Sequence, residues 1–272
     1  MSLEKTVAIV TMISILLAGG AMPDLALPEG SGEIQWPVAM AEPIDPQQVE
    51  LPAEPDPPED DAPSPASSEK IAYLTFDDGP DARQTPQILD ILRQYGAKAT
   101  FFVVGNRVRL YPDLVRRIRQ EGHTVGNHTY SHVYSEIYQN PTAFMWSLEY
   151  CNRAIEAAIG ERTMFVRAPG GSITASGFRT QYGPVLHRHG YRYYDWNVDS
   201  QDAINRKQTA AQMADRVVAA AARLKNPVIL MHDLNTPTTV QALPLILQRL
   251  QALGYSFHAL TLDAPLMQFG GR

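Results

Sequence analysis

Cysteine is nearly absent from this chain of 272 residues, since Cys151 is the only one. One cysteine cannot form an intramolecular disulfide, so the fold is not built on a disulfide framework. Cys151 falls in an apolar helical pattern with Leu148 and Ile155, which predicts a buried side chain. A catalytic thiol would need a nearby base and an exposed position, and the local sequence indicates neither.

Basic residues are almost missing from the first 69 positions, where Lys5 is the only one. This segment holds 13 of the 29 acidic residues and 11 of the 21 prolines, so the net charge of −6 arises there. Residues 70–272 carry 22 Lys and Arg against 16 Asp and Glu. Their basic residues are scattered, without the stripe of a nucleic-acid-binding protein, so we expect no nucleic-acid partner. A neutral or anionic polymer, or ordinary surface solvation, fits this mild charge.

The chain begins with the pattern of an export signal. An apolar run over residues 6–18 follows Lys5, and small residues lead to Ala21. The run is short for a membrane span, so residues 1–21 are expected to be a signal peptide that is cleaved near Ala21. An uncleaved membrane anchor is the alternative, and only then is membrane association expected. Either interpretation predicts an exported protein, in the periplasm, outside the cell or at the cell envelope.

Residues 22–69 are rich in Pro, Glu, Asp, Ala and Ser. Such a segment buries too little apolar surface to offset the entropy cost of folding, which predicts a disordered linker. Residues 70–272 are then expected to form a single catalytic domain.

Short apolar strands alternate with amphipathic helices from Lys70 onward. Strands are expected over residues 71–76, 100–104, 124–127, 163–166, 191–198, 228–231 and 257–262. Helices are expected over residues 85–95, 111–120, 142–159, 210–224 and 240–253. This alternation predicts an α/β fold with a parallel sheet. About seven strands in roughly 200 residues indicate an irregular (β/α) barrel, slightly smaller than an eightfold one.

Polar residues gather after five of the predicted strands. These clusters cover residues 75–80, 127–132, 167–171, 195–202 and 230–233. In parallel barrels the carboxyl ends of the strands lie on one face, and catalytic residues concentrate there. All five clusters are therefore expected to converge.

Two histidines and two carboxylates in these clusters suggest a metal site. His128 and His132 are spaced i, i+4, so one helical turn would aim both rings at the same point, although such spacing also arises by chance. Asp77 and Asp78 could supply one ligand and leave a second carboxylate free. Two histidines, one aspartate and an open position are typical of a catalytic zinc site. A solvated turn or a helix cap is the alternative for the paired carboxylates.

An arginine, a pair of glycines and a histidine at predicted strand ends are further candidates for the site. Arg167 needs a carboxylate partner, because an unpaired buried charge is costly. Gly170 and Gly171 favour a tight turn, whose backbone N–H groups could hold an oxyanion or could simply form the turn. His232 is either a core histidine or an acid of the site, and its place after an apolar strand favours the second interpretation.

Together the five clusters resemble the polysaccharide deacetylases with a NodB-homology domain, carbohydrate esterase family 4. Thr-Phe-Asp-Asp-Gly-Pro and His-Thr-Tyr-Ser-His are similar to the first two motifs of that family. Arg-Ala-Pro-Gly-Gly is similar to its R-x-P-x-G motif, and Leu-Met-His-Asp to its last motif. The motifs follow in the family's order over about residues 70 to 265. The resemblance implies a hydrolase that removes N-acetyl groups from N-acetylglucosamine-type residues of an extracytoplasmic polysaccharide.

The resemblance also implies a role for each metal-site residue. Asp78, His128 and His132 would bind a divalent metal, zinc or cobalt. Asp77 would be the general base that takes a proton from water, with Arg167 holding it ionised.

The other implied roles concern the leaving group and the pocket. His232 would protonate the departing nitrogen, oriented by Asp202 or by its competitor Asp199. The backbone near Gly170 and Gly171 would help to hold the oxyanion. Leu230 and Trp196 would wall the pocket of the acetyl methyl group.

Two departures from the family pattern predict a more open cleft. Ala203 follows Asp202 where the family commonly has tryptophan, and Gly170 stands where an aromatic residue is frequent.

The substrate is expected to be a glycan, either peptidoglycan or chitin-like oligomers. Peptidoglycan is favoured because the domain is basic and because the linker could keep the domain near the cell envelope. An O-deacetylase of acetylated xylan is one alternative. A catalytically silent glycan-binding module is another, although the full set of site residues argues against it.

Overall fold

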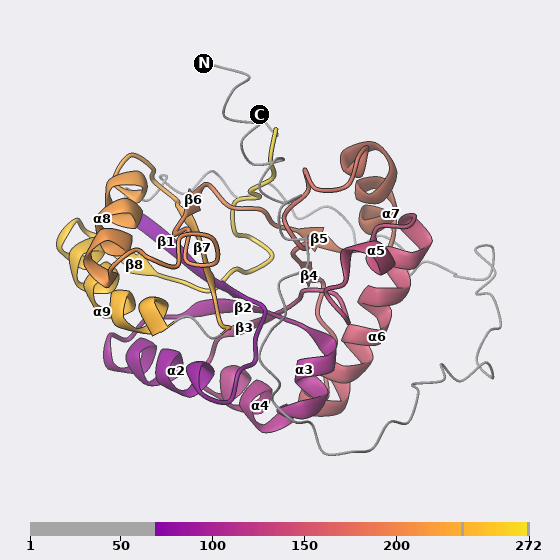
Figure 1. The fold of residues 1–272 in the computed structure, drawn as a ribbon, viewed down its shortest axis with the longest axis horizontal. Helices are drawn as coiled ribbons and strands as arrows, with labels where there is room; N and C mark the ends of the chain where they lie inside the picture. The colour runs from indigo at the N-terminus through magenta and orange to yellow at the C-terminus, as the bar shows by residue number, and fades with distance from the viewer. Residues whose placement is uncertain (1–68, 235–236, 271–272) are drawn as a thin grey trace, which may run out of the picture. The chain divides into compact units, whose positions relative to one another are not determined.

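The computed structural model describes residues 69–234 and 237–270, which are coloured in Figure 1. The expected signal segment, residues 1–21, and nearly all of the expected linker, residues 22–69, lie outside the described residues. Within the described ranges, no helix combines the length and the apolar character needed to cross a bilayer.

One sheet of parallel strands forms the centre of the fold. Its strands are β1 (Lys70–Asp77), β2 (Ala99–Val103), β3 (Thr124–Asn127), β4 (Phe165–Val166), β5 (Arg192–Tyr193), β6 (Val198–Asp199), β7 (Val228–His232) and β8 (Tyr255–Phe257). Seven of them follow the order β5-β4-β3-β2-β1-β7-β6, and β8 pairs with the beginning of β1. The two strands at the ends of this path, β5 and β6, leave the barrel open. The predicted α/β fold with a parallel sheet is therefore confirmed, as an incomplete barrel.

Strand β1 occupies the middle of the sheet, and this explains its apolar sequence. It pairs with β2 on one side and with β7 on the other, so its residues are buried from Ala72 to Asp77. A strand covered on both faces needs a continuous apolar run rather than alternation. The register with β7 sets Asp77 beside His232, which brings two predicted site residues to neighbouring strand ends.

Helices surround the sheet (Figure 1). They are α2 (Gln84–Gln94), α3 (Gly105–Leu110), α4 (Pro112–Gln120), α5 (Tyr134–Ile137), α6 (Pro141–Ile159), α7 (Gly183–Arg188), α8 (Ala210–Ala221) and α9 (Pro237–Ala252), with a π-helical turn η1 (Phe178–Tyr182) before α7. Helix α9 packs against α8 and α2, and α6 packs against α3 and α4. The five longest helices were predicted from the sequence, whereas α3, α5, α7 and η1 were not.

Helix α6 shows why a predicted helix forms where it does. Asn140 caps its first turn by accepting the backbone N–H of Ala143 at 2.9 Å, Pro141 occupies the first position, and Gly160 ends it in a left-handed conformation. Its inner face carries Cys151, which is fully buried and unpaired as predicted. Burial raises the pKa of this thiol, so it is not a thiolate nucleophile.

The prediction of a single strand over residues 191–198 is wrong, because this segment crosses from one end of the sheet to the other. Its first part is β5, next to β4, and its last part is β6, next to β7. Between them, the carbonyl oxygens of Tyr194 and Asp195 accept hydrogen bonds from the Arg167 guanidinium. The backbone N–H of Asp195 donates to Met267 in the C-terminal segment. These groups are therefore not available to a neighbouring strand.

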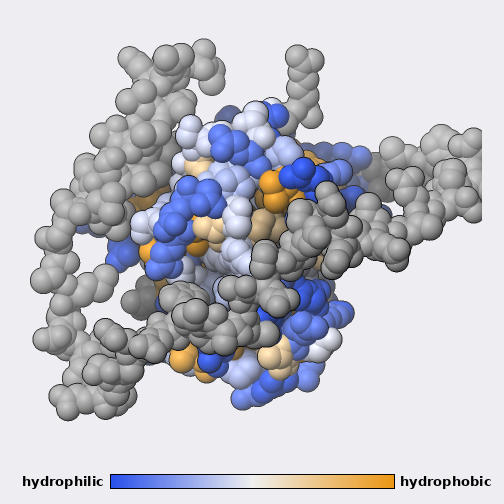
Figure 2. Space-filling view, turned by 90° about the vertical axis from the view of Figure 1, so that its right-hand side faces the viewer, coloured by the Kyte–Doolittle hydropathy of each residue, from blue (hydrophilic) through white to orange (hydrophobic). Residues whose placement is uncertain are grey.

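Apolar side chains are dispersed on one face of the molecule. Figure 2 shows the side of the molecule that lies on the right in Figure 1, and the hydrophobic residues visible there form small groups among hydrophilic ones. Scattered apolar residues are ordinary on a folded domain and mark no site by themselves.

Candidate functional site

The residues predicted to form a site meet at the carboxyl ends of β1, β3, β4 and β7. Asp77 is the last residue of β1, His128 follows β3, Arg167 follows β4, and His232 is the last residue of β7. Asp202 comes from the loop after β6 and reaches His232. The expected convergence of these clusters is thus confirmed for the residues that carry titratable groups.

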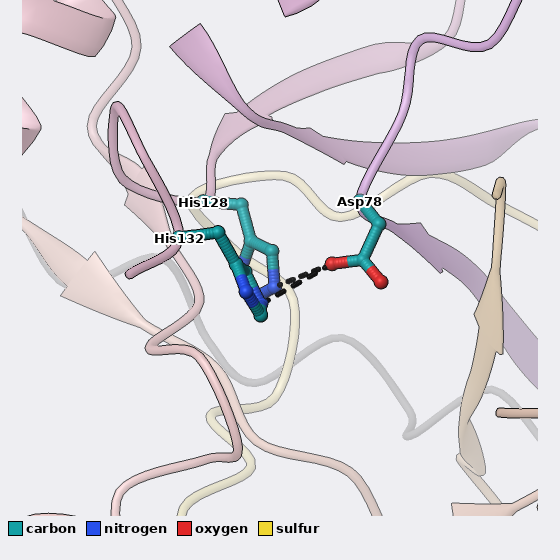
Figure 3. A group of neighbouring side chains, drawn as sticks. All are labelled: Asp78, His128 and His132. Carbon is teal, nitrogen blue, oxygen red and sulfur yellow. Dashed lines mark ion pairs between the residues drawn. The ribbon is translucent and has the colours of Figure 1, made fainter. Parts of the chain in front are cut away.

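Asp78, His128 and His132 form a compact group of potential metal ligands (Figure 3). Asp78 Oδ1 lies 3.5 Å from His128 Nε2 and 3.3 Å from His132 Nε2. One ligand atom from each residue can be chosen so that all three lie within 4.8 Å of one another. In Figure 3 both imidazole rings point toward the Asp78 carboxylate.

The turn that brings the two histidines together is not helical, so the reason given for their convergence was wrong. His128 follows a strand, and Thr129 and His132 have positive φ angles of 69° and 58°. Left-handed residues reverse the chain tightly, and here they fold His132 back beside His128. The ring centroids are 5.0 Å apart.

The donor atoms of this group suit a divalent cation. Asp78 Oδ1 is buried and, among the described residues, has no hydrogen-bond partner. His128 Nδ1 lies 2.8 Å from the Arg167 carbonyl oxygen, so Nδ1–H donates there and the Nε2 lone pair faces Asp78. One carboxylate oxygen with two imidazole nitrogens is a donor set that zinc or cobalt accepts.

Electrostatics keep Asp78 and His132 in forms that can bind metal. Burial alone raises the pKa of Asp78, but its interaction with His128 and the charges of His232 and His132 outweigh this effect and hold the pKa below its ordinary value. Burial, aided by the charge of His128, lowers the pKa of His132 to about 4. The carboxylate is therefore ionised and His132 is neutral at neutral pH.

Arg167 has the carboxylate partner that its burial requires, and that partner is Asp77. The guanidinium is fully buried, and Nη1 donates to Asp77 Oδ1 at 2.9 Å and to Thr75 Oγ1 at 2.6 Å. Its Nε and Nη2 donate to the carbonyl oxygens of Tyr194 and Asp195, each at 3.0 Å. Asp77 Oδ2 remains on the side of the metal ligands, 3.8 Å from His128 Nε2.

Asp202, rather than Asp199, holds the ring of His232. Asp202 Oδ1 lies 2.6 Å from His232 Nδ1, and Oδ2 accepts the His232 backbone N–H at 2.8 Å and Thr239 Oγ1 at 2.7 Å. Asp199 Oδ1 instead accepts the backbone N–H of Gln201 at 2.7 Å. Burial lowers the pKa of His232, but the hydrogen bond and charge of Asp202 outweigh it and raise the pKa to about 9.

The predicted pocket residues lie near this centre. Gly170 and Gly171 have φ angles of 73° and 82°, and the Gly171 N–H donates to Ala168 in a tight turn. Trp196 is half-buried, and its ring packs edge-on against Phe269 with centroids 4.9 Å apart. A Cβ at Gly171 would lie 3.1 Å from Trp196, which is a tight contact. Leu230, on β7, is buried. Ala203 is exposed.

Sequence reasoning gave no role to two buried carboxylates of the same clusters. Asp195 accepts the backbone N–H groups of Ser172 and Phe269, at 2.9 and 2.8 Å, and so ties the glycine turn to the C-terminal segment. Asp233 accepts Thr85 Oγ1 at 2.5 Å, and a Cβ at Gly79 would lie only 2.4 Å from its Oδ2. Burial raises the pKa of Asp233 well above its ordinary value. Their positions at strand ends were the only signal in the sequence.

Comparisons with known proteins agree with this geometry. Residues 64–194 match the polysaccharide deacetylase family. A peptidoglycan-N-acetylglucosamine deacetylase of Bacillus cereus is 38% identical over 196 residues, which cover 70% of this chain and 69% of that protein. The crystal structure of a polysaccharide deacetylase from the same species is similar with a TM-score of 0.69 and 36% identity, covering 74% of this chain and 97% of that one. The catalytic domain of a peptidoglycan N-acetylglucosamine deacetylase from Eubacterium rectale gives a TM-score of 0.70 and 36% identity, covering 77% and 96%.

Proposed function

Because this chain belongs to the polysaccharide deacetylase family, we propose that it is a metal-dependent hydrolase that removes N-acetyl groups from N-acetylglucosamine residues of peptidoglycan. The observation that carries the proposal is the buried Asp78 Oδ1, which has no hydrogen-bond partner in the described ranges and faces two imidazole nitrogens. A second carboxylate, Asp77, lies beside it and is held by Arg167. One carboxylate can therefore bind a metal while the other takes a proton from water.

Asp78, His128 and His132 would hold the cation, which we propose to be zinc, with cobalt as a substitute. When bound there, such a cation polarises the acetyl carbonyl group and lowers the pKa of water.

Asp77 is the proposed general base. Its Oδ1 is occupied by Arg167 Nη1, and its Oδ2 remains free to accept a proton from the attacking water. The Arg167 hydrogen bond fixes the orientation of the Asp77 carboxylate. Arg167 thus acts on the reaction through Asp77.

His232 is the proposed general acid. Because its pKa is raised to about 9, the ring carries a proton at neutral pH. Asp202 accepts from Nδ1 and so orients the ring, and Nε2–H is the proposed donor to the sugar nitrogen as the bond to the acetyl carbon breaks. Acetate and a free amino sugar are the products.

The substrate assignment has two supports. The relatives of highest similarity given above include enzymes named for peptidoglycan N-acetylglucosamine. The domain's surplus of basic residues suits a polymer that carries carboxylates. Trp196 and Leu230 are proposed to wall the acetyl pocket, and export to the cell envelope is proposed from the apolar run at residues 6–18.

Acetate release tests this function. The purified protein is stripped with a chelator, restored with zinc or cobalt, and assayed on peptidoglycan, N-acetylglucosamine oligomers and acetylated xylan. We expect metal-dependent release from peptidoglycan at the highest kcat/KM. Preferred release from acetylated xylan would overturn the proposed bond specificity, and metal-loaded protein that releases acetate from none of the three would overturn the function.

A further inference from the structure

Tyr134 lies at the edge of the site without a role in the mechanism above. It is the first residue of α5, two positions after His132, and its side chain is 37% exposed. Its ring packs edge-on against His132, with centroids 5.6 Å apart. Within residues 69–234 and 237–270, the Tyr134 hydroxyl forms no hydrogen bond. A hydroxyl so close to the ligands is thus available to a bound molecule.

The turn at Gly170 lies directly against this hydroxyl. A Cβ at Gly170 would be 2.8 Å from Tyr134 Oη and 2.4 Å from Thr174 Oγ1, so a side chain there would displace one of them. The φ angle of 73° also favours glycine. The backbone N–H of Gly170 likewise has no hydrogen-bond partner among the described residues. Two donors without a partner among the described residues therefore lie close together.

Their separation suits one shared acceptor. A backbone nitrogen lies about 2.5 Å from the Cβ position of its own residue, which follows from standard bond lengths. Since that Cβ position is 2.8 Å from Tyr134 Oη, the two donors are at most about 5.3 Å apart. An oxygen about 2.9 Å from each donor can bridge a gap of up to about 5.8 Å. A single oxygen atom can thus accept from both.

We propose that Tyr134 Oη–H is a second donor, beside the Gly170 N–H that the family resemblance already implies, at the site for the oxygen of the substrate's acetyl group. This inference rests on the proposed function. Water adds its oxygen to the acetyl carbon, the carbonyl oxygen gains negative charge, and the carbon–nitrogen bond then breaks as nitrogen takes a proton. Tyr134 donates a hydrogen bond throughout and keeps its proton. Donors aimed at an oxygen that becomes charged stabilise the transition state more than the ground state.

The test compares Tyr134→Phe with two matched controls. Tyr150→Phe removes the hydroxyl of another tyrosine that is 37% exposed, on α6, and Thr174→Val removes the other hydroxyl beside Gly170. We expect Tyr134→Phe to lower kcat by about 100-fold on N-acetylglucosamine oligomers with little change in KM. Zinc content should equal that of the wild type, and acetate should bind about tenfold more weakly by calorimetry. Both controls should match the wild type.

Each other outcome overturns the inference. Unchanged kcat and acetate binding in Tyr134→Phe would exclude the phenol as a donor. An equal loss in Thr174→Val would point to packing of the turn, and loss of zinc from Tyr134→Phe would point to the ligands instead. If the wild type releases no acetate, the proposed function fails. The two-donor site is then tested only by whether Tyr134→Phe binds acetate more weakly than the wild type does.

Discussion

Asp77 and Asp78 are consecutive in the chain, yet their carboxylates serve different partners. Asp77 Oδ1 accepts from Arg167 at 2.9 Å, whereas Asp78 Oδ1 faces His132 Nε2 at 3.3 Å. The separation arises because β1 ends at Asp77 and Asp78 adopts a φ of 74°. Successive side chains of a strand point to opposite faces of the sheet, but a residue in the left-handed region no longer follows this alternation. The Asp77 and Asp78 side chains can therefore both reach the site.

Arg167→Met should destabilise the fold strongly, because it leaves Asp77 buried without a counter-charge and two carbonyl oxygens without donors. Breaking a buried pair in this way costs about 3–5 kcal/mol. Arg162→Met is the matched control, since Arg162 pairs with Glu149 at the surface and should cost about 1 kcal/mol or less. Urea unfolding measures both values. Equal losses in the two variants would contradict the role of Arg167 as a buried anchor.

Asp202→Asn should move the alkaline limb of the pH profile of kcat/KM to lower pH. Asp202 is what raises the pKa of His232 to about 9 against the effect of burial. Without its charge the pKa should fall to the ordinary 6.5 or below, and the acid form of His232 is lost at correspondingly lower pH. Asp199→Asn should shift the limb less, because Asp199 does not accept from Nδ1. A limb that stays in place in Asp202→Asn would exclude His232 as the acid.

His123 should make the fold sensitive to acid. It is buried, and its Nδ1 accepts the Ala99 backbone N–H at 3.1 Å, so the ring is neutral. Burial, together with the charge of Lys98, lowers its pKa from 6.5 to about 4. Between these values the unfolded chain binds more protons than the folded one. The free energy of unfolding contributed by His123 is therefore complete above pH 6.5 and falls as pH drops, by up to about 1.4 kcal/mol per unit.

His123→Gln keeps an acceptor for Ala99 and should flatten this dependence. Urea unfolding between the two pKa values measures the slope for the wild type and the variant. His187→Gln removes an exposed histidine and should leave the slope as it is. If His123→Gln and the wild type lose stability in parallel, His123 is not the cause.

The sequence predicted the chemistry of the site better than its geometry. An apolar strand followed by Asp77 and Asp78 was enough to place two carboxylates at a strand end. The convergence of His128 and His132 was also correct, but a helix was expected where left-handed residues form the turn. Positive φ angles at residues other than glycine are set by tertiary contacts, so local patterns do not reveal them.

Long-range contacts explain the other failures. The segment over residues 191–198 was predicted as one strand because its residues favour strands. In the structure, the buried guanidinium of Arg167 donates hydrogen bonds to two of its carbonyl oxygens. Asp199 and Asp202 follow the same strand end, and only the contact with His232 separates them. Both outcomes depend on residues at least 24 positions away, which no local window contains.

Comparison of Asp77→Asn with Asp78→Asn tests the division of labour between these neighbours most directly. Both changes are isosteric, so bound zinc and acetate release can be measured on the same preparations. We predict that Asp77→Asn keeps wild-type zinc content while kcat falls by at least about 100-fold, and that Asp78→Asn loses its zinc. Loss of zinc from Asp77→Asn, or retention of zinc and activity in Asp78→Asn, would contradict the assignment of base and ligand.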